Sequence, residues 1–136
     1  MALVILFDQF SRNLYRNTAK MYATDLLALD LTQRSIADGM DKNLQLIERL
    51  FLYTPLMHAE ELGVQQLSLI FFGELVKDCE RSWPKNIDYF KYTFDYAQRH
   101  FEIIKCFERF PHRNKILNRQ STVEEVDFLK TPNSSF

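Results

Sequence analysis

The stretch Lys85–Glu108, KNIDYFKYTFDYAQRHFEIIKCFE, decides the fold class, because its apolar residues recur with the period of an α-helix. The side chains that form one row along such a helix are Ile87, Phe90, Phe94, Ala97, Phe101 and Ile104. Those that form a second row are Tyr89, Tyr92, Tyr96, His100, Ile103 and Phe107. Spacings of three and four residues place each row on one helix face. Two rows on one helix predict contacts on two sides, as in a layered stack of helical hairpins.

The helical period continues towards the N-terminus in three further segments: Thr18–Ala37, a segment that begins at Asp41, and about Pro55–Lys77. Gly39 is expected to end the first of them, because glycine readily adopts the left-handed conformation at the end of a helix. Pro55 is expected to lie in the first turn of the third, where the missing N–H of proline does no harm.

The segment Ser121–Leu129, STVEEVDFL, predicts one more helix near the C-terminus. Ser121 or Thr122 is the expected N-cap, because a hydroxyl oxygen accepts from the unpaired N–H groups of the first turn. Glu124 or Glu125 is expected to reach back to the cap residue and complete a capping box.

The composition supports the same fold class. Only 3 glycines and 4 prolines occur in 136 residues, too few for the many turns of a sandwich or a barrel, and 46% hydrophobic residues are enough for a core. We therefore predict a single all-α domain over residues 1–130, built from antiparallel helical hairpins in a tetratricopeptide-like stack. The tail 131–136 is expected to fray unless Phe136 docks.

Charge and hydropathy exclude several kinds of partner. The formal net charge is −1, so no overall field attracts nucleic acid or an anionic membrane. No run approaches the roughly 20 apolar residues of a membrane span. The start, MALVILF, lacks the basic residues and the cleavage site of a signal peptide. Cys79 and Cys106 form no CxxC motif and are interpreted as free thiols, which fits a cytoplasmic location.

Polar residues gather in three segments that interrupt the helical pattern. These are DQFSRNLYR (Asp8–Arg16), YTPLMHAEEL (Tyr53–Leu62) and FERFPHRNKILNRQSTVEEVDF (Phe107–Phe128). The 3 histidines of the chain lie in these segments or close to them: His58, His100 and His112. Such clustering points either to a site or to a corner that ties the fold together.

The arginines of these segments have two interpretations. A planar guanidinium binds carboxylate or phosphate through two parallel hydrogen bonds, which lysine cannot do. The first interpretation is an anion pocket, lined by Arg12, Arg109, His112 and Arg113. The alternative is that the arginines only pair with acidic residues and stabilise the carboxyl ends of helices. The acidic partners expected in that case are Asp8, Glu60 and Glu61.

The energetic cost of burying polar groups predicts that the polar side chains of the three segments lie close together. A polar side chain that is buried without a partner destabilises the fold, so several of them next to apolar sequence are expected to share partners. The expected cluster consists of Arg12, His58, Arg109, His112 and Arg113. The acidic residues expected to neutralise it are Asp8 and Glu61, and Asn114 is expected to contact either backbone or ligand.

Other chemistries have weaker signals. His58 and Glu61 share a helix face if one helix contains both, and His100 or His112 is then available as a further metal ligand. The spacing is not HExxH, however, so no metal is predicted and no cofactor is identified. No GxSxG motif occurs.

Four ordered motifs resemble the bacterial family named domain of unknown function 924: DQFSRNLYRNTAKMYATD, ERLFLYTPLMHAEEL, ERFPHRN and NRQSTVEEVDFL. The resemblance runs over nearly the whole chain. It implies a tetratricopeptide-type helical fold, but no established activity, substrate or cofactor. The polar residues that it singles out are Asp8, Gln9, Arg12, Asn13, His58, Glu61, Arg109, Phe110, Pro111, His112, Arg113 and Asn114.

This sequence departs from the family pattern. Ser11 stands where the family usually has proline, and Asn118 stands where it has glycine. Asparagine tolerates the left-handed conformation, so Asn118 is expected to keep the turn. Members usually carry an additional N-terminal portion, rich in aromatic residues, before the segment that begins here at Met1. Its absence is expected to favour a homodimer or poor solubility by exposing apolar side chains, namely Leu3, Ile5 and Phe7.

Two classes of function stay open at this point. The first is a binding module whose pocket, lined by arginine and histidine, takes a small anionic molecule or an acidic peptide end. The alternative is a hydrolase that acts on an anionic substrate, with His58 or His112 as general base, with or without a metal. A purely structural role for the polar motifs is the third interpretation.

Overall fold

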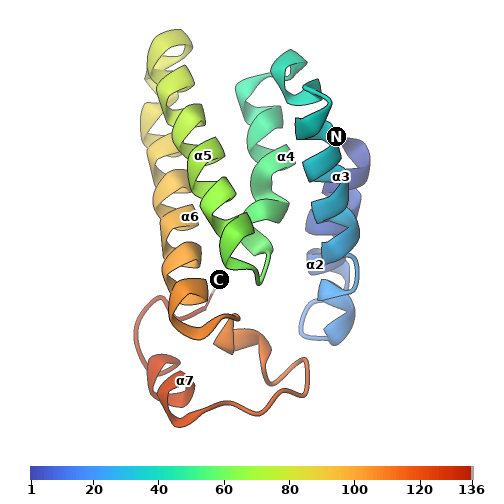
Figure 1. The fold of residues 1–136 in the computed structure, drawn as a ribbon, viewed down its shortest axis with the longest axis vertical. Helices are drawn as coiled ribbons and strands as arrows, with labels where there is room; N and C mark the ends of the chain where they lie inside the picture. Colours follow the sequence, from blue (N-terminus) through green and yellow to red (C-terminus); the bar gives the residue numbers. More distant parts are fainter. Residues whose placement is uncertain (136) are drawn as a thin grey trace.

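The computed structural model describes residues 1–135, whose helices run alternately up and down (Figure 1). No residue of this part of the chain lies in a β-strand, so the prediction of an all-α fold is confirmed. The long helices are α3 (Asp25–Ala37), α4 (Leu46–His58), α5 (Leu62–Ser82) and α6 (Ile87–Phe107). The short elements are α1 (Ala2–Ile5), η1 (Leu6–Phe10), α2 (Ser11–Leu14), η2 (Ala19–Tyr22), η3 (Met40–Asn43), η4 (Pro84–Asn86), η5 (Pro111–Arg113) and α7 (Val123–Phe128). The tetratricopeptide-like stacking stays a prediction, and Phe136 lies outside the described residues.

Helix α6 matches the helix predicted from its two rows and packs along α5 (Figure 1). Its first row is covered, since Phe90 and Ala97 are buried in the main core. Its second row is covered only in the C-terminal half. Tyr89 and Tyr92 are 48% and 60% exposed, whereas His100 is 2% exposed. The prediction of contacts on two sides is therefore wrong for the first half of this helix, where the tyrosines face outward.

The break between α4 and α5 lies later than predicted. Pro55 stands inside α4, and the chain turns at Ala59, whose backbone is extended. The helix continues past Pro55 to His58, and Thr54 Oγ1 donates to the Leu50 carbonyl at 3.0 Å. The last carbonyls of α4 are partly satisfied by Gln65, whose Nε2 donates to the carbonyls of Met57 at 2.6 Å and Ala59 at 2.7 Å. This turn places His58 at the end of a helix.

Replacing Gln65 by methionine is expected to lower the free energy of unfolding by about 1–2 kcal/mol, because the buried carbonyl of Met57 and the partly buried one of Ala59 lose their donor. Gln65 is 0% exposed, and methionine has a similar length, so the loss of packing is small. Urea unfolding of Gln65→Met measures the effect. The matched control is Gln66→Met at the exposed neighbouring position, which is expected to unfold like the parent protein. Equal stabilities of the two variants would contradict this role of Gln65.

After α6 the chain turns through η5 into a loop and then α7, which lies beyond the end of the bundle (Figure 1). Glu108 and Asn118 both have left-handed backbones, with φ of 58° and 53°, so the prediction for Asn118 is confirmed. The predicted capping box of α7 is also present. Thr122 Oγ1 accepts from the Glu125 N–H at 3.2 Å, and Glu125 Oε2 accepts from the Thr122 N–H at 2.8 Å.

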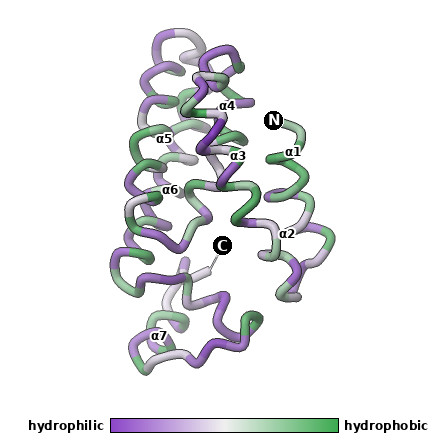
Figure 2. Tube along the Cα trace, turned by 45° about the vertical axis from the view of Figure 1, so that its right-hand side comes forward, coloured by the Kyte–Doolittle hydropathy of each residue, from purple (hydrophilic) through white to green (hydrophobic). Residues whose placement is uncertain are grey.

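The segment α1–η1–α2 lies at one side of the molecule (Figure 2). Its outward side chains are apolar: Leu3, Leu6, Phe10 and Leu14 are 54%, 47%, 53% and 70% exposed. The expected exposure is thus found for Leu3, but Ile5 and Phe7 are half-buried. A homodimer stays a prediction. No helix among the described residues is long and apolar enough to cross a membrane.

Candidate functional site

Side chains of the N-terminal segment reach the interior because that segment is tied to the start of α3. Thr24 Oγ1 donates to the Phe7 carbonyl at 2.6 Å. The Ser11 hydroxyl, 2.8 Å from Thr24 Oγ1, therefore donates to Thr24. Asp25, the first residue of α3, follows directly. Asp8 is one turn before Ser11 on the same stretch and is buried, so its carboxylate lies on the interior side.

The Asp8 carboxylate forms a hydrogen bond with one ring nitrogen of His58. The Asp8 Oδ1 atom lies 2.6 Å from His58 Nδ1, and the Asp8 side chain is 1% exposed. Burial alone would raise the pKa of Asp8, but the neighbouring His58, Arg12 and Gln9 lower it by more, so the pKa lies well below its ordinary value. The carboxylate is therefore ionised and accepts from Nδ1–H. This contact leaves the lone pair of the imidazole on Nε2.

The second nitrogen of His58 is available to a ligand. No described residue forms a hydrogen bond with Nε2, and the atom is not enclosed, because the ring borders the cavities described below. Burial lowers the pKa of His58; Asp8 opposes this shift, whereas Arg12 and Arg113 add to it. The ring is therefore neutral near neutral pH, and Nε2 can accept a proton.

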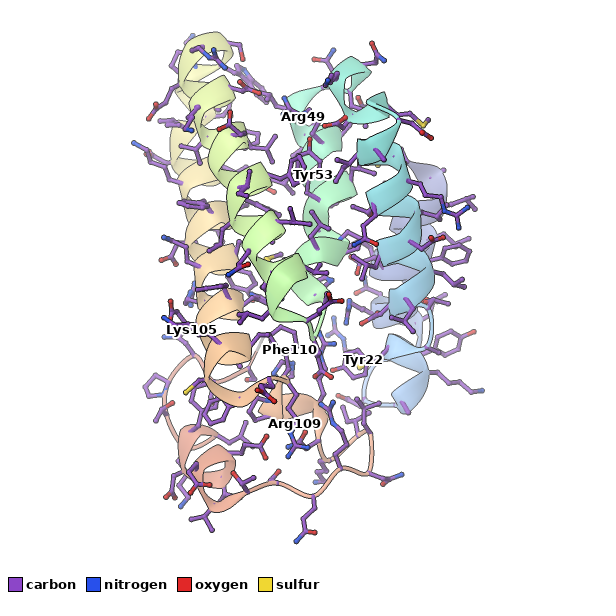
Figure 3. The ribbon with its side chains drawn as sticks, in the orientation of Figure 1. Tyr22, Arg49, Tyr53, Lys105, Arg109 and Phe110 are labelled. Carbon is purple, nitrogen blue, oxygen red and sulfur yellow. The ribbon has the colours of Figure 1, made fainter. Side chains whose placement is uncertain are left out.

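Arg113 is stacked in the interior. Its side chain is 7% exposed, and its guanidinium lies 4.6 Å from the ring centroid of Tyr22 and 4.4 Å from that of Phe110. Figure 3 shows these two aromatic residues at the lower end of the bundle. Nη2 donates to the His58 carbonyl at 3.0 Å. Burial and the nearby Arg12 lower the pKa of Arg113 to about 10, so it stays cationic at neutral pH.

A shared carboxylate brings Arg12 next to Arg113. Asp25 Oδ2 lies 2.8 Å from Arg12 Nη2 and 3.4 Å from Arg113 Nη1. Arg12 Nε also lies 3.4 Å from Asp8 Oδ1. The Arg12 guanidinium lies 5.3 Å from the Tyr22 ring centroid. Burial raises the pKa of Asp25, and the two arginines act against that rise.

Two cavities meet at this network and share Tyr22, His58 and Arg113. The first cavity has a volume of about 570 Å³, and the other polar residues that line it are Arg12, Asn13, Arg16, Asn17, Tyr96, His100, His112 and Ser135. The second has a volume of about 330 Å³, and its acidic lining residues are Asp8, Asp25, Glu60 and Glu61. The charges are thus separated. Among residues 1–135, three arginines and no carboxylate line the first cavity, whereas the carboxylates line the second, which Arg113 also borders.

His100 and His112 add no positive charge to the first cavity at neutral pH. Burial and the nearby His58 lower the pKa of His100 to about 2, and His100 Nδ1 donates to the Tyr96 carbonyl at 2.8 Å. Burial and Arg113 lower the pKa of His112 to about 4. The arginines therefore carry the positive charge of this cavity.

Two candidate residues from the sequence lie at the corner before α7 instead. Arg109 Nε and Nη2 lie 2.6 and 2.8 Å from the Glu125 carboxylate, and Asn114 Nδ2 donates to Glu125 Oε2 at 3.1 Å. The expectation that Arg109 joins the cluster around His58 is therefore wrong, because Arg109 forms its ion pair with the buried carboxylate of Glu125. Arg119 pairs with Glu60 in the same region, at 2.5 and 2.9 Å. The arginines of this corner thus pair with acidic residues, as in the alternative to an anion pocket.

The other two candidates lie at the cavity rims. Asn13 is exposed, lines the first cavity and donates from Nδ2 to the Gln9 carbonyl at 2.8 Å. Glu61 is exposed and lines the second cavity as the N-cap residue of α5. His58 and Glu61 do not share a helix face, because α4 ends before Glu61. Across the described residues 1–135, no group of three or more His, Cys, Asp or Glu side chains is arranged to hold a metal ion.

Sequence reasoning missed three contributors. Asp25 lay inside the predicted helical segment Thr18–Ala37 and did not stand out there, whereas in the structure it is the first residue of α3. Tyr22 looked like one more apolar position in a helical row, although it lies in η2 and packs against two arginines. Arg16 was part of a polar segment but did not stand out from it. The geometry, and not the spacing, assigns these residues to the cavities.

Comparisons with known proteins agree with the helical fold. The model of the family described as bacterial protein of unknown function (DUF924) matches residues 1–133. The solved structure of ATU0120, a protein of unknown function from Agrobacterium tumefaciens, is similar, with 39% sequence identity and a TM-score of 0.74. That likeness covers 95% of this chain and 65% of the other, so this chain spans less than two thirds of that protein. No curated protein matches this chain.

Proposed function

This chain belongs to the DUF924 family of bacterial proteins of unknown function, and on that premise we propose that it binds a small anionic molecule in its first cavity. The ligand class is a compound with a carboxylate or phosphate group, of which an acidic peptide end is one form. The observation that carries the proposal is the lining of this cavity, where Arg12, Arg16 and Arg113 occur and none of the described lining residues is acidic.

The separation of charge favours a ligand over purely internal pairing. Asp8 and Asp25 neutralise parts of Arg12 and Arg113, but both carboxylates line the second cavity, on the other side of the shared side chains. Arg16 is exposed, and its Nη2 donates to the neutral amide oxygen of Asn13 at 3.4 Å. Guanidinium groups that face a cavity without a carboxylate attract an anion, which can accept paired hydrogen bonds.

The size and lining of the first cavity also suit a small molecule. A volume of about 570 Å³ lies in the range of common ligand cavities. Tyr22, Met21 and Ile116 add apolar surface next to the arginines. Such a mixture lets the charged end of a ligand bind the arginines while its carbon skeleton packs on apolar side chains. The deeply buried Arg113 serves the fold as well, so Arg12 and Arg16 are the residues proposed to meet the ligand first.

Succinate and inorganic phosphate are expected to stabilise the protein against thermal unfolding at constant ionic strength. At a free concentration of 100 times Kd the stabilisation would be about 2.7 kcal/mol. Arg16→Gln is expected to weaken binding about tenfold, because one charged hydrogen-bond donor is lost. The matched control is Arg34→Gln, which removes an arginine on the exposed side of α3, where it pairs with Asp30. Equal ligand responses of the two variants, or no response of the parent protein, would contradict the proposal.

The contact between His58 Nδ1 and Asp8 favours a second candidate, a hydrolase that acts on an anionic substrate in this cavity. His58 fits the role of base better than His112, because Asp8 fixes its tautomer and its Nε2 is accessible. A cytoplasmic location stays a prediction from the sequence.

A further inference from the structure

We infer that His58 is a catalytic base for hydrolysis of small carboxylic esters that bear a second, anionic group, and that Asp8 is its positioning residue. This inference rests on the proposed function, because the arginines of the first cavity must hold the anionic group. It deepens the second candidate function by assigning the class of ester that is hydrolysed and the role of each residue of the pair.

The geometry of the pair carries the inference. Asp8 lines the second cavity only, whereas His58 lines both. Nδ1 is bonded to Asp8 at 2.6 Å, and no described residue forms a hydrogen bond with Nε2 of the same ring, which borders the first cavity together with the arginines. A buried carboxylate on Nδ1 with an accessible Nε2 is the arrangement that makes histidine an effective base. The carboxylate fixes the tautomer and stabilises the imidazolium that forms during reaction.

The charged groups around His58 are compatible with this role. Asp8 and Arg12 act on it from the N-terminal segment, Asp25 from α3 and Arg113 from η5. The His100 ring of α6 lies 6.0 Å from the His58 ring between centroids, and His112 lines the same cavity. Burial and the two arginines favour the neutral ring, and Asp8 favours the protonated one. His58 is therefore neutral at neutral pH and can take up a proton during the reaction.

Water is the nucleophile in the proposed step, since no described hydroxyl or thiol side chain is hydrogen-bonded to His58. The water oxygen forms a bond to the ester carbonyl carbon as its proton moves to Nε2, and the carbonyl electron pair moves to the carbonyl oxygen. Return of that pair then breaks the bond to the alcohol oxygen, which takes the proton from Nε2. The products are a carboxylic acid and an alcohol, and His58 is neutral again.

The test uses para-nitrophenyl hemisuccinate, an ester with a free carboxylate, and follows release of para-nitrophenol. His58→Asn is the key variant, because its side-chain N–H can still donate to Asp8 while Nε2 is removed. We expect an about hundredfold lower kcat for this variant, which is the lower end of the range that general bases contribute. Asp8→Asn is expected to lower kcat with little change in KM. Para-nitrophenyl acetate, which lacks the carboxylate, is expected to be a poorer substrate.

Succinate-induced thermal stabilisation, measured on the same samples, separates the two proposals. Loss of hydrolysis in His58→Asn with stabilisation retained supports the inference. Stabilisation of the parent protein without hydrolysis above the His58→Asn level overturns the inference and leaves anion binding standing. Absence of stabilisation overturns both. If His58→Asn does not fold, the pH dependence of the parent protein decides: a rate that rises through one pKa below 6.5 supports the inference, and a flat profile overturns it.

Discussion

Arg113→Ala is expected to lower the free energy of unfolding by about 3–5 kcal/mol, the range for removal of one partner from a buried charge network. The variant loses the stack of the guanidinium between Tyr22 and Phe110. It also leaves the His58 carbonyl without its donor and Asp25 with Arg12 as the remaining cationic partner. The stack adds packing and cation–π attraction, so the loss is larger than that of one hydrogen bond.

Urea unfolding at neutral pH measures this effect. Arg34→Ala is a suitable control, because Arg34 is 70% exposed and pairs with its helix neighbour Asp30. This control is expected to unfold like the parent protein. A loss of less than about 1 kcal/mol in Arg113→Ala would mean that the interior stack contributes little and that Arg113 is a free ligand-binding group.

Acid is expected to destabilise the fold before carboxylates titrate, because the buried His100 resists protonation. The pKa of His100 falls from 6.5 to about 2 on folding, owing first to burial and then to His58. Below pH 6.5 the unfolded chain binds a proton that the folded chain does not. The contribution of His100 to the free energy of unfolding is therefore fully present above pH 6.5 and is lost as the pH falls towards about 2. Each pH unit in this window removes about 1.4 kcal/mol.

Between about pH 7 and about pH 5 the loss attributable to His100 is therefore about 2 kcal/mol. His112, whose pKa falls to about 4, changes stability in the same direction. Urea unfolding over this pH range measures the slope, and His100→Gln is expected to show a shallower one, because glutamine does not titrate. Parallel slopes for the two proteins would show that His100 can be protonated in the folded state.

The sequence predicted the helices where a long apolar period dominated, as in α6 and at the Thr122 capping box. The predicted position of the turn between α4 and α5 was wrong. Proline is compatible with the first turn of a helix, but Pro55 lies near the C-terminal end of α4. The stop is set instead by the extended backbone at Ala59 and by Gln65, which satisfies the carbonyls of α4. That hydrogen-bonding partner lies on the next helix and has no local signal.

The candidate site was predicted in part, because residue type marks polar clustering but not the partner of each side chain. Arg109 and Arg113 belong to one short segment, yet the first pairs with Glu125 and the second reaches the interior. Which of them faces inward depends on the left-handed turn at Glu108 and on η5. Asp25, which joins Arg12 to Arg113, could be found only from tertiary structure.

Nitrogen–proton correlation spectra of the arginine Nε–H groups, recorded during a titration with succinate, test the central claim most directly. We predict that the resonances of Arg12 and Arg16, which line the first cavity, shift with one common saturation curve. The Arg34 resonance, from the exposed side of α3, is predicted to stay in place. Saturable binding that leaves Arg12 and Arg16 unshifted, or no saturable shift of any arginine, would contradict an anion site in this cavity.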